Sequence, residues 1–125
     1  MITLYGIPNC DTVKKARVWL DQNGAAHAFH DYKKAGIDRA SLERWVGELG
    51  WEAVLNRSGT TFRALPDADK ADLTASKAVE LMLAQPSMIK RPVLDLGDRT
   101  LVGFKPEAYE ANGITDMHRD PETVD

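Results

Sequence analysis

The spacing of apolar residues predicts a strand, a helix and a second strand in the first 31 residues. Residues 2–5 form a short β-rich run that stops at Gly6 and Pro8. Helical spacing follows, and Asn23-Gly24 is typical of a helix end. The apolar residues at that spacing are Val13, Ala16, Trp19 and Leu20. Residues 26–31 have the pattern of a strand, so we expect a right-handed βαβ unit and a sheet that begins parallel.

The middle of the chain, from about residue 36 to residue 86, has a helical pattern. Asp38 is a candidate N-cap for one helix and Thr74 for another. The positions expected to face inward are Leu42, Trp45, Val46 and Leu49, then Ala75, Ala78, Val79, Met82 and Leu83. Between the two helices, residues 51–55 and 61–65 have the character of short helical turns. This segment therefore predicts a helical block.

A hairpin and a short helix end the pattern. Two β-rich runs, residues 92–96 and 99–103, flank the turn pair Gly97-Asp98. Pro106 opens a helix that we expect to run to about Ala111. Residues 112–125, which include Ile114, are mostly polar and lack periodicity, so we expect a flexible C-terminal tail.

The order of these elements, βαβ, helical block and ββα, predicts an α/β protein. It is the order of a thioredoxin-like fold, with a mixed sheet and an inserted all-helical subdomain. We expect one domain over residues 1–111, with the insertion at about residues 36–86. In open α/β sheets, sites lie beyond the carboxyl ends of parallel strands, so the loop after the first strand is the place to look for chemistry.

Composition narrows the function classes. The chain has 125 residues, 43% of them hydrophobic, one cysteine and a net charge of −3. No internal disulfide is available, and no apolar run reaches the roughly 18 residues that cross a bilayer, so we expect a soluble, cytoplasmic protein without a membrane partner. The net negative charge argues against nucleic-acid binding. His27 and His30 should lie on opposite faces of a strand, so no metal site is expected.

The only cysteine, Cys10, stands where the first strand ends and the helix begins. Unpaired backbone N–H groups and the positive end of the helix dipole favour the thiolate there. We expect the N–H groups from Asn9 to Thr12 to contribute, and Lys14 lies one helical turn on. Asp11 opposes this electrostatically and is a candidate capping residue. A lone cysteine is often a small buried apolar residue, but this position favours a catalytic nucleophile.

Position 13 decides which redox cycle is available. A dithiol site of CxxC type needs a second cysteine there, and the residue is Val13. Cys10 therefore needs an outside thiol to resolve a mixed disulfide, and glutathione is the abundant cytosolic one. The spacing predicts monothiol chemistry.

Two arginines are candidates to hold an anionic substrate. Arg57 lies in a polar loop, and its planar guanidinium suits carboxylates and oxyanions. A surface ion pair is the alternative explanation. Arg91 precedes Pro92 at the start of a hairpin strand. In a thioredoxin-like frame we expect a cis peptide bond here, which brings Arg91 near Cys10; an ordinary trans proline on an edge strand is the alternative.

Lys105 offers a further cation just beyond the hairpin, next to Pro106. A solvated lysine before a helix is the simpler explanation of this residue. Two of the three tryptophans, Trp19 and Trp45, stand at helical spacing and are expected in the core, and Trp51 is a candidate wall of a groove.

Four segments taken in order resemble the arsenate reductase/Spx (ArsC-like) family, and its YffB-like branch in particular. They are Tyr5–Cys10 with Lys14–Ala16, the Asn56-Arg57 loop, Ile89–Val93 and Leu101–Phe104. The similarity spans residue 1 to about residue 111. It implies a thioredoxin-like fold with an inserted helical subdomain, a nucleophile at Cys10, and oxyanion-binding arginines at Arg57 and Arg91.

The resemblance implies a glutathione-dependent thiol/disulfide oxidoreductase, and we expect a monomer that binds no cofactor. Glutathione would be the co-substrate, with glutaredoxin as a further candidate partner. An arsenate reductase coupled to glutathione and glutaredoxin is the alternative, although Lys105 replaces a third arginine of that class and lacks its bidentate fork. A non-catalytic Spx-like regulator that contacts RNA polymerase is the third reading, and Val13 removes the CxxC switch common in that branch.

Overall fold

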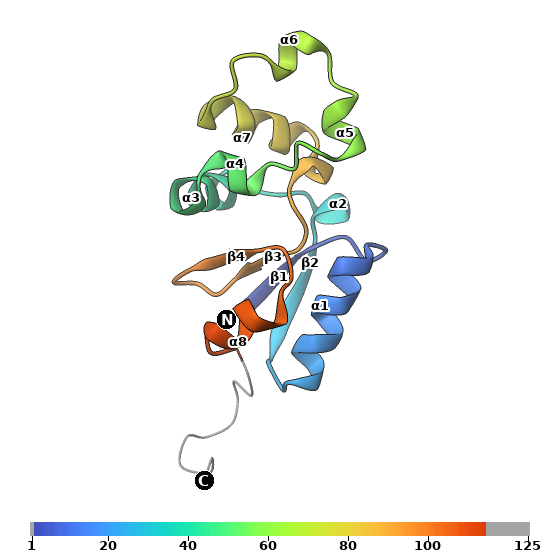
Figure 1. Ribbon diagram of the computed structural model, residues 1–125, viewed down its shortest axis with the longest axis vertical. Coiled ribbons are helices and arrows are strands. Elements are labelled where there is room, and N and C mark those ends of the chain that lie inside the picture. The colour runs from blue at the N-terminus through green and yellow to red at the C-terminus, as the bar shows by residue number, and fades with distance from the viewer. Residues whose placement is uncertain (1, 115–125) are drawn as a thin grey trace. The chain divides into compact units, whose positions relative to one another are not determined.

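The structure is a computed structural model that describes residues 2–114, and it divides into two compact units (Figure 1). The sheet unit combines the chain up to His30 with the chain from Arg91 onward. The helical unit is the continuous segment Asp31–Lys90 between them. The insertion is therefore wider than the expected 36–86, because the turn after the second strand and the segment before Arg91 belong to it.

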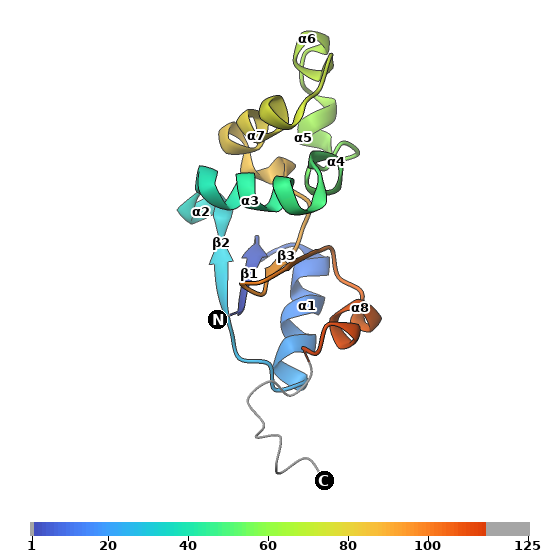
Figure 2. The same ribbon diagram turned by 90° about the vertical axis from the view of Figure 1, so that its left-hand side faces the viewer.

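The sheet unit holds four strands and two helices. They are β1 (Ile2–Gly6), α1 (Asp11–Gln22), β2 (His27–Asp31), β3 (Val93–Asp95), β4 (Thr100–Val102) and α8 (Pro106–Ala111). The strand order is β2-β1-β3-β4, with β3 antiparallel to both β1 and β4. Figure 2 shows the arrows of β1 and β2 pointing the same way. The mixed sheet confirms the predicted α/β, thioredoxin-like class.

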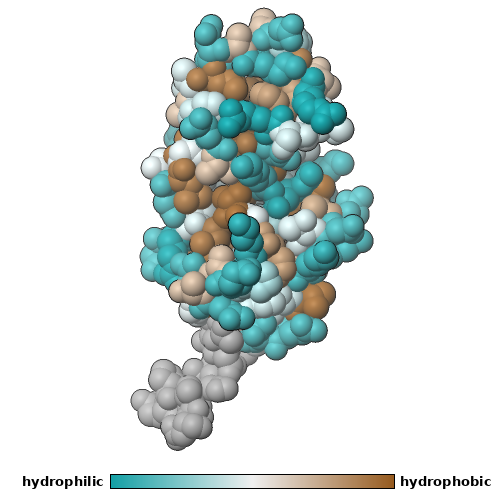
Figure 3. Space-filling model, viewed as in Figure 1, coloured by the Kyte–Doolittle hydropathy of each residue, from teal (hydrophilic) through white to brown (hydrophobic). Residues whose placement is uncertain are grey.

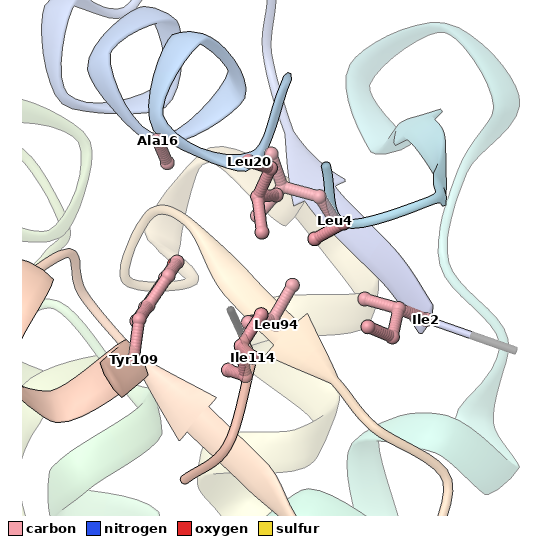
Figure 4. Close-up of a cluster of buried hydrophobic side chains, with 8 residues drawn as sticks. Ile2, Leu4, Ala16, Leu20, Leu94, Tyr109 and Ile114 are labelled. Carbon is pink, nitrogen blue, oxygen red and sulfur yellow. The ribbon is translucent and has the colours of Figure 1, made fainter. Parts of the chain in front are cut away.

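Two helices pack on one face of this sheet and enclose its core. The buried cluster joins strand residues to α1 and α8, and its side chains point toward one another in Figure 4. Its members are Ile2, Leu4, Ala16, Leu20, Ala25, Leu94, Tyr109 and Ile114. Ile114 is fully buried, so the expectation of a flexible tail from residue 112 is wrong at this position. An isolated apolar residue after a helix gives no periodic signal in the sequence, but here it packs in the core. Residues 115–125 lie outside the described part of the chain.

The helical unit has four helices of one turn each, two longer helices and a 3₁₀ turn, and two of the one-turn helices, α2 and α6, were not predicted from the sequence. The set is α2 (Tyr32–Ala35), α3 (Arg39–Leu49), α4 (Trp51–Val54), α5 (Thr60–Arg63), α6 (Asp67–Lys70), α7 (Ala75–Ala84) and η1 (Pro86–Met88). Asp38 caps α3 by accepting from the Ser41 N–H at 2.9 Å. Thr74 caps α7 by accepting from the Lys77 N–H at 3.2 Å. Both predicted caps are confirmed. They can be predicted from the sequence because a capping side chain bonds to N–H groups of its own helix.

One predicted core position in α7 is wrong. Ala75 is exposed, whereas Ala78, Val79 and Met82 are buried. Ala75 is the first residue of the helix and lines an open hollow with Val79 and Val46. The buried stripe of α7 therefore begins one turn later than the apolar spacing indicates.

The two ends of the helical unit are tied to each other. The Tyr32 hydroxyl donates to the Ile89 carbonyl at 3.2 Å. Leu55 and Ile89 form an isolated antiparallel bridge, and the Lys90 N–H donates to the Val54 carbonyl at 2.8 Å. The chain therefore enters and leaves this unit at neighbouring points. Among residues 2–114, no helix combines the length and the apolar character that spanning a membrane requires.

Candidate active site

Cys10 is the N-cap residue of α1, at the end of the loop that leaves β1. Its backbone is extended, with φ −93° and ψ 126°, and its side chain makes no capping hydrogen bond. The Cys10 carbonyl accepts from the Lys14 N–H at 2.9 Å, which is the first backbone hydrogen bond of the helix. Asp11 is the first helical residue, so its expected role as the cap is wrong. The partly exposed thiol is left beside the unpaired N–H groups of the first turn.

Polar side chains surround this thiol in the sequence. Asn9, Asp11, Thr12 and Lys14 are all exposed on the loop and the first turn of α1. Their side chains are thus open to solvent near Cys10, and their contacts with a substrate stay a prediction.

Val13 fixes the first turn of α1 against the end of β1. A Cβ atom built on Gly6 would lie 2.8 Å from one Val13 methyl carbon and 3.2 Å from the other. Val13 is fully buried. The residue that replaces a second cysteine is therefore a packing residue, and the absence of a side chain at Gly6 lets the Cys10 loop begin this close to the helix.

Pro92 lies at the same end of the sheet as the Cys10 loop. The Arg91–Pro92 peptide bond is cis, as expected from the fold context. In the antiparallel register, Tyr5 pairs with Val93, so the next pair places Pro92 opposite Gly6. On its other side the Pro92 carbonyl accepts from the Gly103 N–H at 2.8 Å. Pro92 is buried and Arg91 is half-buried, which leaves part of the arginine open to solvent.

Lys105 belongs to this end of the sheet through β4. It follows Gly103 by two residues and is the N-cap residue of α8, where its carbonyl accepts from the Ala108 and Tyr109 N–H groups. The Tyr109 hydroxyl donates to the Gly103 carbonyl at 3.4 Å, and burial raises the pKa of Tyr109, so this hydroxyl stays neutral. The register thus brings Cys10, Arg91 and Lys105 to one end of the sheet unit.

Arg57 lies in the helical unit, on the loop between α4 and α5. The Asn56 carboxamide oxygen accepts from the Ser58 N–H at 3.2 Å, and the Asn56 N–H donates to the Met88 carbonyl at 2.7 Å, which together fix the loop. The Arg57 guanidinium carbon lies 5.3 Å from the centre of the Trp51 ring. Within residues 2–114 Arg57 pairs with no carboxylate, which leaves its planar fork available. That it acts together with Cys10 stays a prediction.

The ArsC family model matches residues 5–112. The chain belongs to the ArsC family. It is 68% identical to a solved structure of a protein named YFFB (PA3664), with a TM-score of 0.87, over 89% of this chain and 97% of that one. An arsenate reductase (ArsC) related protein from Brucella melitensis is 55% identical, with a TM-score of 0.71, over 88% of this chain and 92% of the other.

More distant relatives of the chain include proteins named as transcriptional regulators. The global transcriptional regulator Spx of Streptococcus mutans is 27% identical over 113 residues, which cover 89% of this chain and 82% of that protein. The predicted ArsC/Spx-like, YffB-like assignment is confirmed by these matches. The matches thus include both arsenate-reductase-related and regulatory proteins, so a choice between these two functions depends on the residues of the site in this chain.

Two of the three histidines have local partners, and the third, His118, lies outside the described residues. His27 Nδ1 lies 2.9 Å from the Ala25 carbonyl oxygen, and the His30 ring lies 4.8 Å from the ring of Tyr5. Within residues 2–114, no three histidine, cysteine or carboxylate side chains gather as a metal site.

Sequence reasoning missed a groove beside α1. Its cavity of about 360 Å³ is lined by Lys14, Lys15, Val18, Trp19, Gln22, Phe104 and Pro106. The signal that reveals it in the sequence is Val18, an apolar residue off the buried stripe that Val13, Ala16 and Leu20 define. Such a residue on the polar side of a helix is exposed unless something covers it.

Proposed function

We propose that this ArsC protein is a glutathione-dependent monothiol reductase with Cys10 as its nucleophile. The observation that carries the proposal is the Cys10 thiol at the N-cap of α1, unused in capping, at the end of the sheet to which the strand register also brings Arg91 and Pro92. A thiol beside free N–H groups at a helix start is suited to react as a thiolate.

The reaction is a pair of thiol–disulfide exchanges. The Cys10 thiolate attacks the glutathione sulfur of a mixed disulfide R–S–SG; the S–S bond breaks, a Cys10–SG disulfide forms, and RS⁻ leaves and takes up a proton. The thiolate of a second glutathione attacks the glutathione sulfur of Cys10–SG. Oxidised glutathione leaves and Cys10 returns as thiolate, so one glutathione is oxidised for each R–SH released.

The cations have one role in this scheme, which is to hold the two carboxylates of glutathione. Arg91 and Lys105 belong to the same end of the sheet unit as Cys10, and the resemblance to arsenate reductases adds Arg57 as a third candidate cation. Arginine forms bidentate hydrogen bonds with a carboxylate, and lysine supplies a point charge. The expected N–H donors to the thiolate are narrowed to the start of α1, because the N–H of Cys10 itself donates to the Ile7 carbonyl at 3.4 Å.

The decisive experiment is glutathione-dependent turnover of a small glutathione mixed disulfide by wild-type protein and by Cys10→Ser. We expect turnover to be lost, because a serine hydroxyl does not form the mixed disulfide. Lys33→Gln, which changes an exposed lysine of α2, is the control and should keep full turnover. Retained turnover in Cys10→Ser would reject Cys10 as the nucleophile. Arg91→Lys and Arg57→Lys should raise the KM for glutathione, because they keep the charge and lose the fork.

Arsenate reduction is the second candidate, favoured by the 55% identical relative named as arsenate reductase related. The same thiolate would form an adduct with arsenate, with glutathione and glutaredoxin supplying the electrons. Lys105 weighs against it, because a lysine grips an oxyanion without bidentate geometry. Arsenate-dependent oxidation of glutathione in the presence of glutaredoxin would support this reading, and its absence would exclude it.

A regulator of the Spx kind is the third candidate, favoured by the 27% identical relatives. The sequence holds no second cysteine for a disulfide switch, and position 13 is occupied by a buried packing valine. Recovery of RNA polymerase subunits with the tagged protein, unaffected by Cys10→Ser, would favour the regulator over the reductase.

A further inference from the structure

The groove beside α1 has an apolar floor and lies wholly in the sheet unit. Four of its lining residues are Val18, Trp19, Phe104 and Pro106. Val18 is 53% exposed, and it is the large hydrophobic residue that stands out as exposed among the described residues. Figure 3, in the view of Figure 1, shows a hydrophobic spot amid hydrophilic side chains over α1. An apolar residue kept in water at the edge of a hollow is a place for another apolar side chain.

The core holds the floor of the groove in place. Trp19 meets Tyr109 edge to face, with ring centres 5.4 Å apart, and Phe104 meets Tyr109 in the same way at 5.0 Å. Such aromatic packing fixes ring orientation. The groove is therefore preformed, and a ligand does not have to order it.

The rim of the groove is positive in a protein of net charge −3. Lys14 and Lys15 line it, and Lys105 stands between Phe104 and Pro106 in the chain. None of the three lysines forms an ion pair with a carboxylate in the stretch 2–114. Carboxylates on a partner are complementary to this rim and would set its orientation and the rate of encounter more than its affinity.

The groove is aligned with the nucleophile. Lys14, Val18 and Gln22 follow Cys10 at successive intervals of four residues, so they form a ridge along α1 that starts at the thiol. Val18 lies about 12 Å from Cys10 along the helix axis at 1.5 Å per residue. An extended peptide covers that distance in roughly four residues.

From these observations we propose that the groove recognises protein substrates: segments in which an apolar side chain, flanked by Asp or Glu, stands about four residues from the glutathionylated cysteine. The proposal rests on the proposed function and specifies its substrate class. The Cys10 thiolate takes the glutathione from the segment, whose own cysteine leaves as thiolate and is protonated. The apolar side chain occupies the groove, and the carboxylates face the lysines of the rim.

The test measures the activity of the full-length protein on two substrates. One is a short peptide with an S-glutathionyl cysteine and, four residues away, a leucine flanked by glutamates. The other is the mixed disulfide of glutathione and 2-mercaptoethanol, whose leaving thiol carries no apolar side chain to occupy the groove. Val18→Asp should lower kcat/KM for the peptide about tenfold and leave that for the small disulfide unchanged. Lys15→Glu should lower it less, and Lys33→Glu, the same charge change at an exposed lysine outside the groove, should not.

A binding measurement separates failure of the groove from failure of the reductase. The same peptide with serine in place of cysteine is titrated against wild type and Val18→Asp by NMR. Weaker binding to the variant supports the groove even if neither disulfide is turned over, which would reject the proposed function alone. Equal binding of the peptide to both proteins, or an equal loss of kcat/KM on both substrates, would overturn the proposal that the groove recognises protein substrates.

Discussion

The two units of this protein differ in how the chain builds them. The helical unit is one continuous segment, and its longer helices are started by capping residues of the same segment, such as Asp38 and Thr74. The sheet unit joins two segments that the whole insertion separates, and its central pair, β1 with β3, is long-range. The comparison teaches that the residues around the proposed nucleophile depend on long-range pairing, since the β1–β3 register brings Arg91 and Pro92 to the end of β1.

The comparison also predicts an order of dependence. The helical unit brings its own ends together through the Tyr32 to Ile89 hydrogen bond. Pairing β1 with β3 requires those ends to be close, and closing an unstructured loop of this length costs a few kcal/mol of chain entropy. The sheet unit should therefore depend on the helical unit more than the reverse.

The largest expected effect tests this dependence with two matched leucines. Leu94 in β3 and Leu42 in α3 are both fully buried. Each Leu→Ala change should cost about 2 to 5 kcal/mol, because it removes buried methyl groups and leaves a cavity. Leu42→Ala should reduce amide-exchange protection in both units, and Leu94→Ala mainly in the sheet unit. Equal loss everywhere in both variants would contradict the asymmetry.

A smaller effect distinguishes one glycine in each unit. Gly6→Ala should destabilise the protein by about 1 to 3 kcal/mol, because the new Cβ would lie 2.8 Å from a buried Val13 methyl carbon. Gly47→Ala in α3 meets nothing within 4 Å and should stabilise by about 0.5 to 1 kcal/mol, as expected for alanine in a helix. Denaturant unfolding measures both. A stable Gly6→Ala protein would mean that α1 moves away from β1 at little cost.

The smallest effect is the response of the helical unit to acid. The Ser41 hydroxyl and N–H that donate to Asp38 lower the pKa of its carboxyl below the ordinary 3.8, and the Arg39 hydrogen bond lowers the pKa of Glu80 below 4.5. A lowered pKa means stability that is present above the unfolded value and lost as pH falls through the folded one. Below about pH 4 the protection of α3 should therefore fall.

Asp38→Asn is the matched control for that acid response. Asparagine still caps a helix but does not titrate in this range, so the variant should lose part of the pH dependence while α3 stays formed. An acid profile identical to that of the wild type would mean that Asp38 does not contribute to it.

Many helix starts, caps and turns of this protein could be predicted from its sequence because they depend on local interactions. The start of α1 at Cys10, the caps Asp38 and Thr74, and the turn at Gly97-Asp98 all depend on neighbours within a few residues. The order of the elements then predicted the thioredoxin-like class, and Val13 by its identity alone excluded a dithiol site. The candidate nucleophile was available from the sequence for the same reason: a strand end followed by a helix start is a local pattern.

Only the tertiary structure decided which residues meet across the chain. The close approach of Gly6 to Val13, the position of Pro92 between β1 and β4, and the burial of Ile114 follow from packing between distant segments. The groove at Val18 belongs to the same class, because its far wall comes from Phe104 and Pro106. Hydrophobic periodicity tells which face of an element avoids water, but it does not tell which element covers that face or which face is left open.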